Sequence, residues 1–181
     1  MLSPEVVALG VAAVMGLWIL GAHNRLVRLR QAVNAAYAPI DELLRRRHAL
    51  LAELIEASTP QLADQAEAIA AVDAARLQAR AAADHAAQRP AHADRLASLV
   101  LAEQVLRSAS SRLVALVKAR AALRADARVR EVMASLSTTQ HRLSAARHAF
   151  KATVLDYNRN AQQFPTRFVA AMFGFRDAGS L

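Results

Sequence analysis

Hydrophobic positions recur every seven residues over most of this chain. Between Asn24 and Ala57, one row of such positions is Leu26, Val33, Ile40, Arg47 and Leu54, and a companion row three residues further on is Leu29, Ala36, Leu43, Leu50 and Ala57. Towards the C-terminus the same period gives Val129, Leu136, Leu143, Phe150, Tyr157 and Phe164. A sustained seven-residue period predicts long α-helices that pack along coiled-coil-like seams.

Prolines and capping residues divide this pattern into four helices. Pro60 follows Ser58 and Thr59, either of which can cap a helix, and Pro90 marks a second break. A third break near 124–127 has no proline or glycine, and Asp126 is its expected cap. The predicted helices cover 24–57, 60–87, 91–123 and 127–164, with Leu99, Leu106 and Leu113 as the seam of the third. Short links between long helices predict an all-α, antiparallel up-down bundle of four helices.

An uncharged apolar segment of seventeen residues, 6–22, precedes the first seam. Its length is at the short end for a membrane-spanning helix, with Pro4 and Glu5 suited to the helix start and Trp18 to the interface. The alternative is a cleaved signal peptide, which needs a basic start that this sequence lacks. We therefore expect a transmembrane anchor over 1–23, a helical bundle over 24–164 and a tail over 165–181. The first helix should continue straight out of the membrane.

Arginines follow the apolar segment, and no arginine or lysine precedes it. Arg25, Arg28 and Arg30 come directly after the segment, and 45–47 is a run of three arginines. Positive charge is enriched on the cytoplasmic flanks of membrane spans. The pattern therefore predicts a single-pass protein of the cell (inner) membrane, with the N-terminus outside and the bundle in the cytoplasm.

Composition excludes several classes of function. Hydrophobic residues make up 55% of the 181 residues and aromatic residues only 4%, because alanine supplies much of the apolar content. No glycine lies between Gly21 and Gly174, which excludes glycine-dependent phosphate loops, dinucleotide folds and nucleophile elbows from the body. The net charge of +8 is spread along the helices, and the scarcity of aromatics disfavours nucleic-acid binding.

The polar residues form no recognisable catalytic or metal-binding pattern. The six histidines include no pair spaced by four and no Glu-x-x-His motif, so we expect them at the surface, and the chain has no cysteine. Asp41 and Glu42 are adjacent and point to different faces of a helix, which disfavours paired-carboxylate catalysis. We expect no enzyme activity, no cofactor and no metal site.

Arg47 is a charged residue in a seam that is otherwise filled by leucine, valine and isoleucine. A buried arginine requires a partner, so we expect a carboxylate or a helix-end carbonyl within hydrogen-bonding reach. The run of which it is part, Arg45, Arg46, Arg47 and His48, is either a solvated helix face or a contact for lipid or a partner.

The tail is rich in phenylalanine. Four of the five phenylalanines, Phe164, Phe168, Phe173 and Phe175, fall within the last eighteen residues. An up-down order of four helices brings this tail back to the bilayer, level with His23 and Asn24. A short helix with Phe168, Ala171, Met172 and Phe175 on one face would either lie in the headgroup region or cap the open end of the bundle.

Two stretches of the chain resemble the signatures of the LemA family. They are HNRLVRLRQAVNAAYAPIDELLRRRHALLAELIE at 23–56, and YNRNAQQFP at 157–165 followed by FGF at 173–175. The matching positions are Asn24, Leu26, Val27, Leu29, Arg30, Val33, Ala36, Ile40, Asp41, Leu44, Arg46, Arg47, Leu50, Leu54, Arg147, Tyr157, Asn158, Phe164, Pro165, Gly174 and Phe175. The chain departs from the family pattern at Ala49, Ala52, Gln140 and the pair Phe150-Lys151.

The resemblance implies a bacterial membrane-anchored protein of long helices with no established catalytic activity. We expect a scaffold or interaction protein of the cell envelope, with membrane lipid and an unidentified envelope protein as partners. A homo-oligomer is compatible with this function, and nucleic acid is not an expected partner. The alternative is a peripheral bilayer-binding or remodelling protein that uses basic helices and the Phe-rich tail on anionic lipid. The candidate structural or partner contacts are Asn24, Arg30, Asp41, Arg46, Arg47, Tyr157, Asn158, Phe164, Pro165, Phe173, Gly174 and Phe175.

Overall fold

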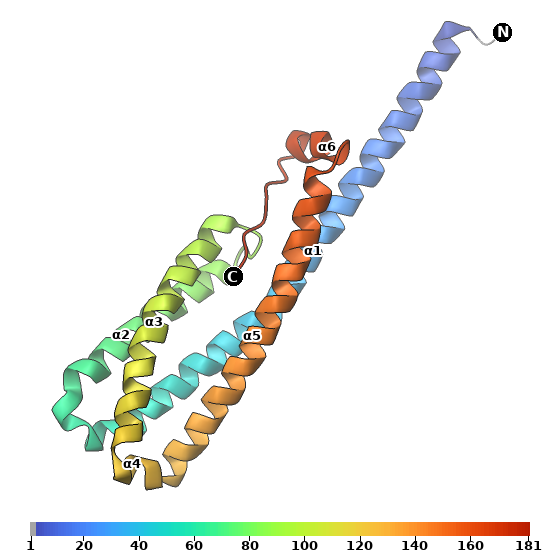
Figure 1. The fold of residues 1–181 in the computed structure, drawn as a ribbon. Helices are drawn as coiled ribbons and strands as arrows, with labels where there is room; N and C mark the ends of the chain where they lie inside the picture. Colours follow the sequence, from blue (N-terminus) through green and yellow to red (C-terminus); the bar gives the residue numbers. More distant parts are fainter. Residues whose placement is uncertain (1–2) are drawn as a thin grey trace.

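The computed structural model describes residues 3–181 and consists of helices joined by short links (Figure 1). The helices are α1 (Pro4–Ser58), α2 (Ala66–Ala87), α3 (Ala93–Ala119), α4 (Ala121–Ala125), α5 (Ala127–Gln162) and α6 (Thr166–Met172). Two short 3-10 turns, η1 (Thr59–Gln61) and η2 (Ala63–Gln65), connect α1 to α2. The predicted all-α class is confirmed for the described residues. The first two residues of the predicted anchor lie outside the described range.

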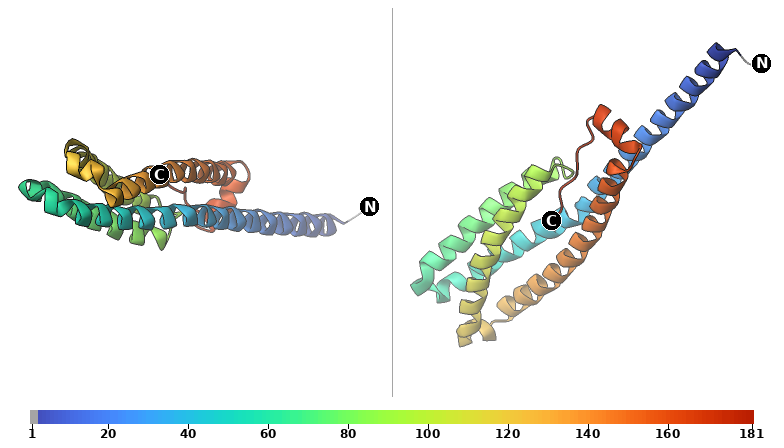
Figure 2. Two further views of the ribbon diagram at one scale, coloured as in Figure 1. Left: turned by 90° about the horizontal axis from the view of Figure 1, so that it is seen from below. Right: turned by 45° about the horizontal axis from the view of Figure 1, so that its top comes forward.

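Helix α1 is one continuous helix of 55 residues, about 80 Å long at 1.5 Å per residue. Its N-terminal part projects beyond the rest of the molecule and packs against no other helix in either view of Figure 2. Pro39 lies inside the helix without ending it. Pro39 and Ala35 both face solvent, so water can bond to the carbonyl that the proline leaves without a donor.

The long helices pack as two antiparallel pairs, α1 with α5 and α2 with α3, which join where α2 runs antiparallel along α1. At the end far from the N-terminus, Leu54 of α1 packs with Val72, Val117 and Val129 from α2, α3 and α5. The backbones of α3 and α5 lie further apart than those of the paired helices, although side chains of both enter the shared core clusters. The bundle therefore has a groove at its surface between α3 and α5.

The predicted seam of α1 is confirmed, because Leu26, Val33, Ile40, Arg47 and Leu54 are all buried. The companion row packs against the same core clusters, but at their edge. Leu29, Ala36, Leu43, Leu50 and Ala57 are only half-buried, whereas the residues four positions after the seam from Val33 onward, Tyr37, Leu44, Leu51 and Ser58, are buried. Helix α1 lies between α5 and α2, so it buries a face wider than a two-helix seam.

Two predicted helix boundaries also differ from the structure. The second helix begins at Ala66 rather than near Pro60, because the 3-10 turns η1 and η2 occupy the residues in between. The third long helix ends at Ala119, and the short helix α4 follows a non-helical residue, Arg120. Asp126 caps α5 as expected, since its side chain accepts a hydrogen bond from the Val129 backbone N–H at 3.1 Å.

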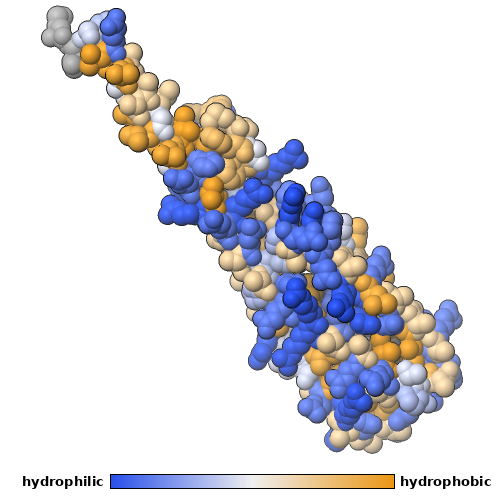
Figure 3. Space-filling model, turned by 180° about the vertical axis from the view of Figure 1, so that it is seen from behind, coloured by the Kyte–Doolittle hydropathy of each residue, from blue (hydrophilic) through white to orange (hydrophobic). Residues whose placement is uncertain are grey.

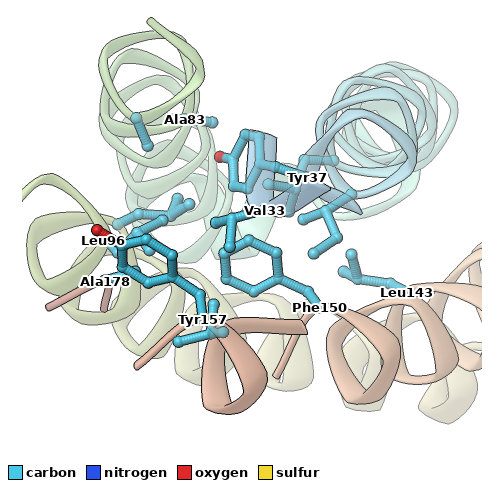
Figure 4. Close-up of a cluster of buried hydrophobic side chains, with 13 residues drawn as sticks. Val33, Tyr37, Ala83, Leu96, Leu143, Phe150, Tyr157 and Ala178 are labelled. Atoms are coloured by element: carbon cyan, nitrogen blue, oxygen red, sulfur yellow. The ribbon is translucent and has the colours of Figure 1, made fainter. Parts of the chain in front are cut away.

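Aromatic, aliphatic and alanine side chains share the core cluster that surrounds Val33 and Tyr37 of α1 (Figure 4). The rings of Tyr37 and Phe150 meet edge to face with centroids 5.8 Å apart. The buried residues of α2 here are small, Ala83 and Ala86, which allows this helix to approach the aromatic side chains closely. Ala178, from the segment after α6, enters the same core, so the C-terminal tail is part of the packed body.

Candidate functional site

A buried ionic triad joins three of the long helices. Arg47 of α1 donates to Glu103 of α3 at 2.5 Å, and Arg147 of α5 donates to the other carboxylate oxygen at 3.0 Å. The side chain of Glu103 is 5% exposed and that of Arg47 is 10% exposed. The predicted carboxylate partner of Arg47 is therefore confirmed. Each partner comes from a different helix, so the triad fixes the positions of α1, α3 and α5 relative to one another.

Sequence reasoning missed Glu103, although a signal for it existed. Glu103 lies four residues after the predicted seam residue Leu99, in the same kind of displaced row that is buried in α1. Positions three and seven residues after Leu99 do not include Glu103, so the seam pattern did not predict its burial. Arg147 was among the family-like positions, but its pairing with Glu103 follows from the three-dimensional arrangement alone.

Other polar groups near the triad are buried with unused hydrogen-bonding capacity among the described residues. They are the Tyr37 hydroxyl, Oδ1 of Asp41 and both ring nitrogens of His48. Burial lowers the pKa of His48 to about 4, helped by the charge of Arg47, so this histidine is neutral at pH 7. Burial also raises the pKa of Tyr37 well above its usual range. The expectation of surface histidines is wrong for His48, because the burial of α1 extends beyond its predicted seam.

A groove of about 730 Å³ lies beside the triad, between α3 and α5. Its floor includes Arg47 and Leu51 of α1. The residues that α3 contributes are Arg107, Ser110, Ser111, Val114 and Lys118, and those of α5 are Met133, Leu136, Ser137, Gln140, Ser144 and Arg147. The lining thus contains four cationic, four apolar and five neutral polar side chains, and no carboxylate.

The C-terminal signature residues tie the tail to α5. The Tyr157 hydroxyl donates to the Arg176 carbonyl at 3.0 Å. Asn158 makes two bonds to Ala178, donating to its carbonyl at 3.0 Å and accepting from its N–H at 2.9 Å. Gly174 adopts a positive φ of 70°, a conformation that favours glycine where the chain turns from α6 towards these contacts. The geometry gives Tyr157, Asn158 and Gly174 a structural role in docking the tail.

The Phe-rich tail lies at the base of the projecting part of α1, as predicted. The rings of Phe173 and Phe175 are 4.5 and 5.5 Å from the ring of His23. Leu26 of α1 packs with Val169 and Ala170 of α6, and Ile19 and Ala22 lie against the same cluster. The predicted position of the tail, level with His23, is therefore confirmed. Figure 3 shows the apolar N-terminal part of α1 extending from a body whose surface mixes hydrophilic and hydrophobic residues.

The tail leaves several apolar side chains in solvent. Phe164, Phe168 and Met172 are exposed, and Phe173 is 49% exposed although it contacts His23. Phe164 was predicted to extend the buried row of α5. That prediction is wrong, because α5 ends at Gln162 and Phe164 falls in the link before Pro165, which caps α6.

The remaining candidate residues are dispersed. Asn24, Arg30 and Arg46 are exposed at different heights along α1. Arg46 lines a small hollow of about 230 Å³ against α5. Asp41 pairs with Arg45 one turn later, at 2.7 Å. The structure therefore does not gather the predicted positions into one site, but divides them between the triad, the tail docking and the solvent-facing side of α1.

Among the described residues, one helix is long and apolar enough to cross a membrane, and the apolar part of that helix is unburied. The molecule is thus an all-helical body on a candidate membrane helix. The model of the LemA family matches residues 36–181. The chain belongs to the LemA family. A search of the curated proteins finds no match.

Proposed function

We propose that this protein is a membrane-anchored helical scaffold that binds another protein of the bacterial cell envelope and catalyses no reaction. The observation that carries the proposal is the continuity of α1 from Pro4 to Ser58. A span and a body that share one helix hold the body at a fixed distance and angle from the bilayer. An enzyme on a flexible tether would not need this rigidity, whereas a scaffold does.

The orientation follows the charge asymmetry. The arginines that flank the apolar segment all lie on its C-terminal side, which favours a cytoplasmic body and an outward N-terminus in the inner membrane. In this arrangement the four long helices form an antiparallel bundle that projects into the cytoplasm. Arg47 would lie about 38 Å along α1 from Ala22.

The polar interior supports a structural role rather than a catalytic one. Glu103 is shared by two arginines, so its carboxylate is not available as a general base or a nucleophile. The described residues contain no group of three or more histidines and acids that could hold a metal ion. Asp41 is held by Arg45 on the same helix.

Photo-crosslinking in cells tests the scaffold proposal. The photoreactive amino acid p-benzoylphenylalanine would replace exposed residues on several faces of the full chain, including Leu77, Val105, Ser137 and Leu155. We expect at least one position to give a discrete protein adduct of defined mass. Adducts with lipid only, or no adduct from any face, would contradict the proposal.

A second candidate function, peripheral bilayer binding, is favoured by the exposed Phe168 and Met172 beside the base of the apolar helix. Trp18 is the only tryptophan, so a Trp18→Phe, Phe168→Trp double variant reports on position 168 alone. We expect brominated lipids to quench this tryptophan when the full chain is in anionic nanodiscs. A matched Trp18→Phe, Leu155→Trp variant, exposed on α5, should be unquenched. Equal quenching of both reporters, or of neither, would count against lipid contact by the tail.

A further inference from the structure

We infer that the groove between α3 and α5 is the docking site for an amphipathic α-helix of the partner protein, with acidic residues beside its apolar face. This inference rests on the proposed scaffold function and specifies the partner's chemistry. It starts from the groove of about 730 Å³ that lies between these two helices beside the triad.

The shape of the groove fits a helix. Arg107, Ser110, Val114 and Lys118 recur at helical spacing on one wall, over about 16 Å of α3. Met133, Leu136, Gln140, Ser144 and Arg147 do the same on the other wall, over about 21 Å of α5. Two nearly continuous walls of about three to four turns match the length over which an amphipathic helix inserts its i, i+3, i+4 and i+7 anchors.

The charge of the groove selects an acidic occupant. Four of its lining residues are cationic, and Arg107 and Lys118 form no ion pair with any residue that the structure describes. Arg47 and Arg147 share a single carboxylate, so the triad carries a net positive charge beside the groove. Glutamate or aspartate side chains on an incoming helix would supply the missing negative charge.

The lining favours a protein helix over other occupants. Leu51, Val114, Met133 and Leu136 provide an apolar strip, but five neutral polar residues interrupt it, which is poorly suited to a lipid acyl chain. The groove is also far from the bilayer in the proposed topology, since its floor residue Arg47 lies about 38 Å along α1 from Ala22. A second copy is a poor occupant, because the chain has a net charge of +8.

The decisive experiment is photo-crosslinking in cells with p-benzoylphenylalanine at Ser137 in the groove, compared with Leu77 on the exposed side of α2. We expect a protein adduct from position 137 whose crosslinked peptide is an amphipathic segment with acidic residues. The adduct should be lost in an Arg107→Glu, Lys118→Glu background. It should persist in an Arg89→Glu, Arg124→Glu background, which changes the net charge equally at exposed sites outside the groove.

A binding measurement with a defined probe keeps the two proposals separable. The probe is a fluorescent 14-residue helical peptide with leucines on one face and four flanking glutamates, titrated against the full chain in nanodiscs. We expect the Arg107→Glu, Lys118→Glu variant to bind it about ten-fold more weakly or worse, and the Arg89→Glu, Arg124→Glu variant to bind as the wild type does. Equal binding by both variants overturns the inference.

The crosslinking results show which of the two proposals is wrong, the docking groove or the scaffold function. Protein adducts at Leu77 and none at Ser137 would refute the groove and leave the scaffold standing. A groove adduct with lipid, with a second copy of the chain, or with a basic peptide would also refute the inference. An absence of protein adducts from every face would refute both proposals.

Discussion

Replacing Glu103 by glutamine should destabilise the body more than most single substitutions outside the hydrophobic core. The change keeps the size and shape of the side chain and removes its charge. Both partners, Arg47 and Arg147, would then be positively charged in the interior without a counter-ion. The side-chain exposures of the two arginines are 10% and 18%, so water can reach them only partly.

The magnitude follows from how deeply the triad is buried. Removing one member of a buried ion pair costs about 3–5 kcal/mol, chiefly because the remaining charge is left unpaired. Glutamine can still accept a hydrogen bond from one arginine through its amide oxygen, which lowers the expected cost to about 3 kcal/mol. The triple variant Arg47→Met, Glu103→Leu, Arg147→Met removes all three charges together. It should therefore be more stable than Glu103→Gln alone.

Urea unfolding of the detergent-solubilised full chain, followed by far-UV circular dichroism, measures these differences. The matched control is Glu42→Gln, which removes the same charge from an exposed position of α1 and should change the unfolding free energy by less than about 0.5 kcal/mol. If Glu103→Gln falls within about 1 kcal/mol of this control, the triad does not hold the helices together. A triple variant less stable than Glu103→Gln would also refute the argument.

Other predictions follow from single contacts. The folded-state pKa of His48, about 4, is below its usual value of 6.5, so its contribution to stability is complete above pH 6.5 and is lost as the pH falls towards 4. The loss of unfolding free energy between pH 7 and 4.5 should be larger in the wild type than in His48→Leu, by about 2 kcal/mol. Phe150→Ala should cost about 3–5 kcal/mol in urea unfolding, because the ring is fully buried. Asp126→Ala should cost about 1 kcal/mol through loss of the α5 cap. Asn158→Ala should release the C-terminal segment, seen as faster trypsin cleavage after Arg176, and an unchanged cleavage rate would contradict the docking role.

Much of the fold could be predicted because the seven-residue period of apolar residues indicates which side of each helix is buried. Leu26, Val33 and Ile40 identify the central row of α1, and Leu99, Leu106 and Leu113 identify that of α3. The period does not show how many neighbours a helix has. That limitation explains why the companion row is only half-buried, and why the burial of His48 and Glu103 was not predicted.

The candidate site was less predictable for a related reason. The groove depends on how far apart the backbones of α3 and α5 lie, and no local sequence pattern shows the distance between two helices. Arg47 could be singled out because a charge interrupts an apolar row. Its pairing with a residue 56 positions away depends on the tertiary arrangement. The position of Phe173 beside His23 was predictable, because the number of helix reversals determines which end the tail reaches.

We propose that α1 crosses the membrane once and holds the body in the cytoplasm. The chain has no cysteine, so Ser3→Cys and Ser135→Cys each introduce a single thiol, before and after the apolar segment. The measurement is labelling of intact cells with a membrane-impermeant maleimide, repeated after permeabilisation. We predict that position 3 is labelled in intact cells, while position 135 is labelled only after permeabilisation. Labelling of position 135 in intact cells would contradict the cytoplasmic position of the body.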